Sequence, residues 1–190
     1  MRKSKTEAAE TRRQIVEVAA QEFRRNGIHA TGVATLMSKA GLTHGGFYKH
    51  FDSKEQLVAE ACAMGMNNMV DAFKAAAGEH DGKDSFRAIV ERYVSAVHRD
   101  NATGGCPLAG MGSELARADD RTRDAAAQGF GEMVDVIAAH IGRRSADAAR
   151  SEAVLALTAM IGAVTMSRIL TDADASAAVL RDVRQHLDAL

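Results

Sequence analysis

Apolar residues recur at helical spacing along most of the chain, and no stretch alternates between apolar and polar residues as a strand does. Near the amino end, Ile15, Ala19 and Phe23 fall on one side of a helix, which Gly27 ends. The single proline and the abundance of Ala, Leu and Met fit a helical bundle. We therefore predict an all-α protein. The predicted helices span residues 11–26, 33–40, 44–50, 54–77, 84–99, 107–117, 120–141, 146–170 and 174–188.

The segment 41–54, GLTHGGFYKHFDSK, joins a short helix to the next one. Gly41 suits the left-handed conformation that ends a helix, and Thr43 suits the cap of the following one. Helix, glycine-containing turn and helix make a helix-turn-helix, whose second helix normally enters the DNA major groove. A surface loop between two helices is the plain alternative. Downstream, Ser53 and Gln56 stand at capping-box spacing and predict the start of a longer helix.

On these residues, 11–60 resemble the DNA-binding domain of the TetR/AcrR family of transcriptional regulators. The matching stretches are TRRQIVEVAAQEFRRNGIHATGV, residues 11–33, and LMSKAGLTHGGFYKHFDSKEQL, residues 36–57. The resemblance implies an N-terminal three-helix DNA-binding domain with a helix-turn-helix, over residues 1–53. It also implies a C-terminal helical bundle for ligand binding and dimerisation, over residues 54–190, and a bacterial cytoplasmic location.

The resemblance assigns DNA contacts to particular side chains. Thr43 and Tyr48 match hydroxyl positions that contact phosphate, and Lys54 matches a phosphate-binding lysine. Tyr48 as a half-buried ring and Lys54 as a solvated charge are the alternatives. The complete expected set is Thr35, Thr43, His44, Gly45, Gly46, Tyr48, Lys49, His50 and Lys54.

Within that set, His44, Gly45 and Gly46 occupy positions that face base edges. The two glycines carry no side chain, so direct reading of bases rests on His44 and on Thr35 of the preceding helix. Glycine costs a helix about 1 kcal/mol relative to alanine, but it lets the backbone approach a groove wall closely. His50 has a plainer alternative, which is local packing and hydrogen bonding. Phe47 and Phe51 are expected in the core.

Charge divides the chain in the same way. Up to Lys54 there are ten Lys/Arg and five Asp/Glu, whereas the remainder holds fourteen and twenty, and the total is −1. A basic head on an acidic body predicts an electrostatic footprint for nucleic acid at one end only. The alternative is that solvated helix faces happen to differ in sign.

The body offers adaptable apolar side chains for a small-molecule cavity, because methionine fits irregular apolar shapes. Ordinary core filling is the alternative for each residue. The candidate ligand-binding residues are Met66, Met69, Phe73, Tyr93, Cys106, Met111, Phe130, Met133 and Met166.

Cys106 is also a candidate redox sensor. Pro107 suits the first position of a helix, which places Cys106 at its N-terminal cap, where the helix dipole favours the reactive thiolate. A small residue in a tight loop is the alternative. Cys62 is expected to be a buried small hydrophobe.

The last two predicted helices supply a candidate dimer interface. Residues 153–170 are apolar almost all round, so this helix should be buried on more than one side. A buried helix of a monomeric core is the alternative. The expected interface residues are Ala156, Ala159, Gly162, Ala163, Val179, Leu180, Val183 and Leu187.

Other classes find little support in the sequence. There is no phosphate-binding glycine loop after a strand, no nucleophile elbow and no zinc-helix spacing of histidines, so an enzyme, a metal site and a cofactor are not expected. Two cysteines make no disulfide framework, and neither a signal peptide nor a run of about 18 apolar residues is visible.

We therefore expect a ligand-responsive DNA-binding transcriptional regulator. Its partners would be a palindromic double-stranded operator, a second copy of the chain and a small apolar or electrophilic effector that releases the DNA. A repressor is favoured, and an activator stays open. The alternative class is a non-enzymatic helical interaction module without sequence-specific DNA binding.

Overall fold

A computed structural model describes residues 5–78, 80, 83–142 and 145–190, and within these ranges the chain is helical and contains no strand. This confirms the all-α prediction. In chain order the helices are α1 (Lys5–Asn26), α2 (Val33–Lys39), the 3₁₀ helix η1 (His44–Lys49), α3 (Lys54–Gly78), α4 (Lys83–Tyr93), α5 (Ala96–Asp100), α6 (Pro107–Leu115), α7 (Asp120–His140), α8 (Ala146–Ile169) and α9 (Ala173–Leu187).

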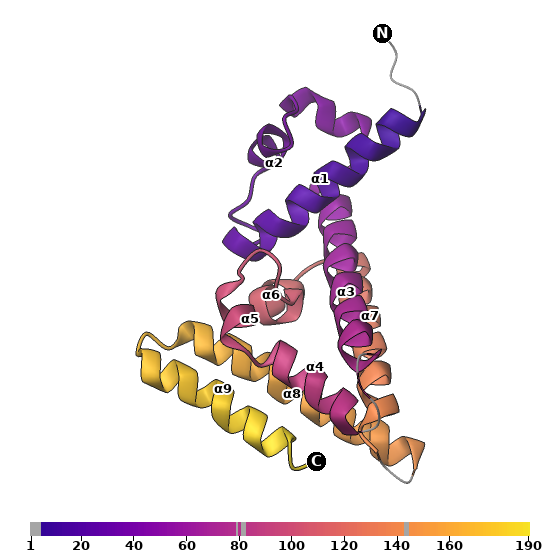
Figure 1. Ribbon diagram of the computed structural model, residues 1–190. Coiled ribbons are helices and arrows are strands. Elements are labelled where there is room, and N and C mark those ends of the chain that lie inside the picture. Colours follow the sequence, from indigo (N-terminus) through magenta and orange to yellow (C-terminus); the bar gives the residue numbers. More distant parts are fainter. Residues whose placement is uncertain (1–4, 79, 81–82, 143–144) are drawn as a thin grey trace.

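The elements form a small head and a larger body (Figure 1). The head holds α1, α2, η1 and the first turns of α3. Helix α3 then runs into the body alongside α7, its main packing partner, and α8 and α9 lie side by side at the far end. A single continuous helix, α3, therefore joins the head to the body.

The apolar stripe predicted on the first helix forms the core of the head. Ile15, Ala19 and Phe23 of α1 are at most 1% exposed. Gly27 and Gly41 end their helices with positive φ angles of 85° and 70°, as expected for glycine at this position. Helix α1 begins at Lys5, earlier than the predicted residue 11, since the largely polar residues 5–10 are also helical.

The cap predicted at the start of α3 is present. The Ser53 hydroxyl accepts a hydrogen bond from the Gln56 N–H at 3.2 Å, and the Gln56 side chain accepts one from the Asp52 N–H at 2.8 Å. These bonds satisfy backbone donors that a helix start leaves free. They fix the point where the long helix α3 begins.

The single helix predicted over 84–99 is wrong, because the chain breaks it at Ser95. Helix α4 ends at Tyr93, and Ser95, in an extended conformation, caps α5 by accepting a hydrogen bond from the His98 N–H at 3.1 Å. Serine competes with the helix in this way because its hydroxyl bonds the nearby backbone. The His98 ring then bonds the carbonyl of Tyr93 at 2.7 Å, which ties the two short helices together.

Helix α8 has two apolar faces. Ala153, Leu157 and Met160 are fully buried against the body, whereas Leu155 and Ile169 are each 62% exposed. By length and mean hydropathy, 1.4 over 18 residues, α8 resembles a membrane-spanning helix, although core helices of other proteins share these properties. The outward apolar face therefore needs an explanation other than the protomer's own core.

Candidate nucleic-acid interface and body cavity

The recognition segment η1 is held to the head by its aromatic residues. Phe47 is 1% exposed and stacks on Phe51, with ring centroids 5.5 Å apart. Tyr48, the next residue, packs edge-to-face against the Phe47 ring, with centroids 5.2 Å apart, but is 67% exposed. One side of this short helix is therefore core, as predicted for Phe47 and Phe51, and the other side faces solvent.

The solvent side collects the polar residues predicted to meet DNA. Thr43 stands at the N-cap, but its hydroxyl forms no cap hydrogen bond and stays available to another partner. Gly45 faces open space, since an added Cβ would meet nothing within 4 Å, whereas Gly46 is half-buried against Met37. Exposed members of the predicted set are Thr35, Thr43, His44, Gly45, Tyr48 and Lys49.

Lys54 and His50 are only half-exposed, and both take part in holding the head together. The Lys54 ammonium donates a hydrogen bond to the Ile28 carbonyl at 2.7 Å. The His50 carbonyl accepts one from Arg12 Nε at 3.2 Å. Lys54 keeps two further N–H donors for a phosphate, so its predicted role and this structural role are compatible.

Arg12 of α1 connects the recognition segment to α3. Its guanidinium lies 4.5 Å from the centroid of the Phe51 ring and makes a two-point ion pair with Glu60. The hydrogen bonds from Arg12 lower the pKa of the Glu60 carboxyl, so it is ionised at neutral pH. No local sequence pattern predicts this contact, because its two residues lie 48 positions apart in the chain.

Comparison with known proteins decides the class of this head. Residues 15–61 match the model of the family described as bacterial regulatory proteins, tetR family. Residues 83–186 match the C-terminal domain described as transcriptional regulator LmrA/YxaF-like. The chain belongs to the TetR/AcrR family. It is thus a DNA-binding transcriptional regulator and not an enzyme.

Individual relatives agree with this assignment. An uncharacterized HTH-type transcriptional regulator of Mycobacterium tuberculosis is 27% identical over 184 residues, 93% of each chain. The probable acrEF/envCD operon repressor of Escherichia coli K12 is 26% identical over 106 residues, which cover 53% of this chain and 48% of that one. The crystal structure of a TetR transcriptional regulator from Chloroflexus aurantiacus has 27% identity and a TM-score of 0.82, covering 97% and 95% of the two chains.

The body of this TetR-family chain contains a cavity of about 650 Å³ between α3, α4 and the segment 95–104. A volume of about 300–1,000 Å³ is usual for small-molecule sites. Met69, Phe73 and Tyr93 of the predicted ligand set line it. The full lining is Asn68, Met69, Ala72, Phe73, Glu91, Arg92, Tyr93, Ser95, Val97, His98, Asn101 and Gly104.

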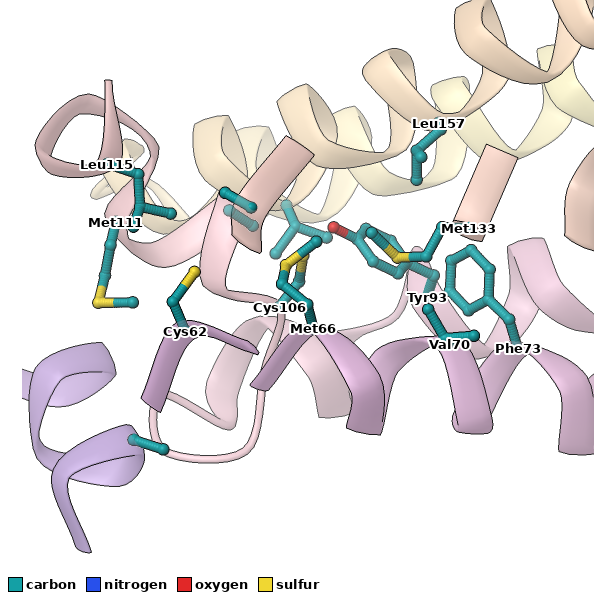
Figure 2. Close-up of a cluster of buried hydrophobic side chains, with 14 of the residues drawn as sticks. Cys62, Met66, Val70, Phe73, Tyr93, Cys106, Met111, Leu115, Met133 and Leu157 are labelled. Carbon is teal, nitrogen blue, oxygen red and sulfur yellow. The ribbon is translucent and has the colours of Figure 1, made fainter. Parts of the chain in front are cut away.

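The other predicted ligand residues lie elsewhere. Met66, Cys106 and Met133 are at most 1% exposed and belong to the closely packed core, and Figure 2 shows Met66 and Cys106 on the side toward which the Tyr93 hydroxyl points. Met111, 5% exposed, packs in the core near α1, and Phe130 is half-buried on α7. Met166 is 46% exposed on the outer face of α8, so its assignment to the cavity is wrong.

The prediction of an activated thiolate at Cys106 is also wrong. Cys106 stands at the N-cap of α6, as predicted, but it is fully buried. Burial raises the pKa of its thiol and outweighs the hydrogen bonds from the helix start that lower it. Burial likewise raises the pKa of Cys62 from 9.0 to about 11. Redox sensing by Cys106 stays a prediction, without the activated thiolate that motivated it.

Behind the cavity lies a buried polar network that the sequence pattern does not predict. His98 Nδ1 bonds the Tyr93 carbonyl at 2.7 Å, and Nε2 accepts from the Cys106 N–H at 2.9 Å, so the ring is neutral with its proton on Nδ1. Burial lowers the pKa of His98. Arg168 of α8 donates to the carbonyls of His98 and Arg99, each at 2.9 Å.

The predicted dimer residues divide between two faces. Ala156, Ala163, Leu180 and Leu187 are at most 6% exposed within one protomer, so their assignment to an interface is corrected to internal packing. Ala159, Val179 and Val183 are half-buried, and Gly162 is exposed. The apolar side chains that the protomer leaves outward on α8 are Val154, Leu155, Met166 and Ile169.

Metal chemistry finds no support in the part of the chain that the structure describes, since no group of three His, Cys, Asp or Glu side chains there could hold an ion. The exposed face of η1 can meet DNA, and the body cavity can take a small molecule.

Proposed function

We propose that this chain is a ligand-responsive repressor that binds a palindromic operator as a homodimer in the cytoplasm. The observation that carries the proposal is the two-sided recognition segment. Phe47 and Phe51 fix one side in the core, and the other side presents Tyr48 and its polar neighbours to solvent. Such a short helix, rigidly held and polar outside, is suited to the major groove.

The hydroxyl and ammonium donors around η1 support phosphate binding by the head. Tyr48, Thr43 and Lys49 carry exposed donors around η1, and Lys54 lies at the start of α3. Phosphate contacts set the position of a protein on the duplex, while base edges set the sequence. His44 and Thr35 then carry base recognition, and Gly45 brings the backbone close to the groove wall.

The outward apolar face of α8 supports the dimer. Leu155, Gly162 and Ile169 recur at helical spacing and form one stripe along the helix. Soluble monomers rarely leave a contiguous apolar stripe in water. A two-fold dimer through this stripe would place two heads on successive major grooves, roughly 34–36 Å apart. The operator would then read as an approximate palindrome.

The cavity beside Phe73 and Tyr93 supports a small, largely apolar effector. An effector acts only if it binds one conformer of the dimer better than the other. The conformer with an occupied cavity would hold its heads at a spacing that no longer matches DNA. Repression is supported by the Escherichia coli relative, which is described as a probable operon repressor.

Fluorescence anisotropy with a duplex selected from a random pool tests the proposal. Wild type should bind this duplex, and affinity should fall steeply with salt because bound phosphates release counterions. A double variant, Tyr48→Phe with Lys49→Gln, should bind at least about tenfold more weakly, since hydrogen bonds to charged groups contribute about 1.5–3 kcal/mol each. A matched change on the opposite side of the body, Arg181→Gln, should bind as wild type does. Equal binding by all three proteins would refute the proposal.

A further inference from the structure

Arg24, near the end of α1, reaches out of the head and contacts the body. Its Nε donates a hydrogen bond of 2.6 Å to the carbonyl of Thr103, a residue 79 positions further along the chain. Its guanidinium lies against Gly65 of α3, where an added Cβ would come within 2.6 Å of Nη1. A side chain larger than hydrogen at position 65 would therefore displace it.

This guanidinium is not held by a carboxylate. Among the described residues, Arg24 makes no ion pair, although several other arginines of the chain do. Burial lowers the pKa of Arg24, which is the mark of a charge with little compensation. A partly buried charge resting on one carbonyl is sensitive to any movement of that carbonyl.

Thr103 lies in a short turn between two residues of the cavity wall. Asn101 and Gly104, on either side of Thr103, both line the cavity. The Asn101 side chain accepts a hydrogen bond from the Gly104 N–H at 2.8 Å, which closes the segment 101–104 into a tight turn. A molecule that pushes on this turn from the cavity therefore pushes on the partner of Arg24.

Both ends of the turn are anchored. On one side, Arg168 of α8 holds the carbonyls of His98 and Arg99. On the other side, the His98 ring holds the N–H of Cys106, where α6 begins. Between these anchors, the hydrogen bond from Arg24 links the turn to the head. Movement of the turn would therefore reach α1 through Arg24.

We propose that Arg24 is the positioning residue through which occupancy of the body cavity acts on the DNA-binding head. An occupant displaces the turn 101–104, the Thr103 carbonyl leaves Arg24, and α1 loses its fixed orientation on the body. Since the recognition segment is tied to α1 through Arg12, its position changes as well. This inference rests on the proposed function, because it explains how the effector would release DNA.

A covalent occupant tests the inference without knowledge of the effector. Val97 lines the cavity and is 81% exposed, whereas Cys62 and Cys106 are at most 2% exposed. A Val97→Cys protein can therefore be labelled at one position with N-(1-pyrenyl)maleimide. The measured quantity is the affinity for the selected duplex with and without the label, in three backgrounds: Arg24, Arg24→Met and Arg25→Met.

The label should weaken DNA binding by about tenfold or more when Arg24 is present, within the usual range of coupling between sites. In Arg24→Met the effect should fall below about twofold, since the link is already broken. Arg25→Met removes the same charge from the exposed neighbour and should keep the full effect. Arg24→Lys keeps a positively charged donor for the Thr103 carbonyl and should keep most of the effect, which separates a lost contact from a damaged fold.

The outcomes are distinct. If the unlabelled proteins bind no duplex, the proposed function fails and the inference fails with it. If they bind DNA but the label has no effect, or an equal effect with and without Arg24, the inference alone is overturned.

Discussion

The Phe47 ring stacks on the Phe51 ring, with centroids 5.5 Å apart and planes at 24°. This pair fixes the buried side of the recognition segment, while Tyr48 between them is 67% exposed. Residues adjacent in sequence thus have different roles: the two phenylalanines stabilise the head, and Tyr48 faces solvent. Substitutions at the two kinds of position should separate stability from DNA affinity.

Phe47→Ala should lower the free energy of unfolding by about 3–5 kcal/mol, because it leaves a cavity in the small core of the head. Tyr48→Phe removes only an exposed hydroxyl and should leave stability within about 0.5 kcal/mol of wild type. Chemical denaturation followed by circular dichroism measures both. A large loss of stability in Tyr48→Phe would show that this side chain also belongs to the core.

Gly45→Ala should weaken binding to the selected duplex by about tenfold, which corresponds to a loss of roughly 1.4 kcal/mol of binding free energy. The added methyl meets nothing within 4 Å in the protein, so the fold should tolerate it. Gly131→Ala, on α7, adds a methyl into open space far from η1 and is the control. Anisotropy titrations compare the three proteins. Unchanged affinity in Gly45→Ala would mean that the backbone does not approach the groove at this point.

Leu155→Glu combined with Ile169→Glu should convert the dimer to a monomer. Each side chain is 62% exposed in one protomer, and burial of two such charges in an interface is strongly unfavourable. Sedimentation velocity at micromolar concentration gives the assembly state. Val97→Glu, at an exposed apolar residue of α5 that is not part of the outward stripe on α8, should remain dimeric. A dimer that survives both charges must use a different face.

The neutral His98 ring predicts a pH dependence of stability. Burial holds the pKa of His98 below its usual 6.5, so the unfolded chain binds a proton in acid before the folded chain does. This contribution is complete above about pH 7.5 and is lost as pH falls through 6.5 toward the folded pKa. His98→Gln cannot titrate, so the stability difference between wild type and variant should shrink from pH 8 to pH 5.5. Urea denaturation at each pH measures it, and a constant difference would contradict a buried neutral ring.

Local signals in the sequence were enough to place the head. Gly41 ends a helix, Ser53 starts one, and the spacing of Ile15, Ala19 and Phe23 gives the buried side, all within a few residues of each other. The resemblance to the TetR/AcrR family rested on the same stretch. Element types and the core of the head were therefore predictable from neighbouring residues alone.

Features that depend on distant residues were not predictable. The helix expected over 84–99 breaks because Ser95 caps α5 and the His98 ring bonds the Tyr93 carbonyl. The spacing of apolar residues does not predict these side-chain hydrogen bonds to the backbone. Ala156 and Leu155 lie side by side on an all-apolar helix, so the sequence did not tell which one faces inward. Contacts such as Arg24 with Thr103 join positions 79 apart and leave no local pattern.

In the proposed complex, two copies of this head bind two half-sites of one duplex. The decisive measurement is selection of bound DNA from a random pool by the purified protein, at low and at physiological salt. We expect recovery of a single inverted repeat, with half-sites about one helical turn apart from centre to centre. Recovery of no enriched sequence, or of a lone half-site without its inverted copy, would exclude this complex.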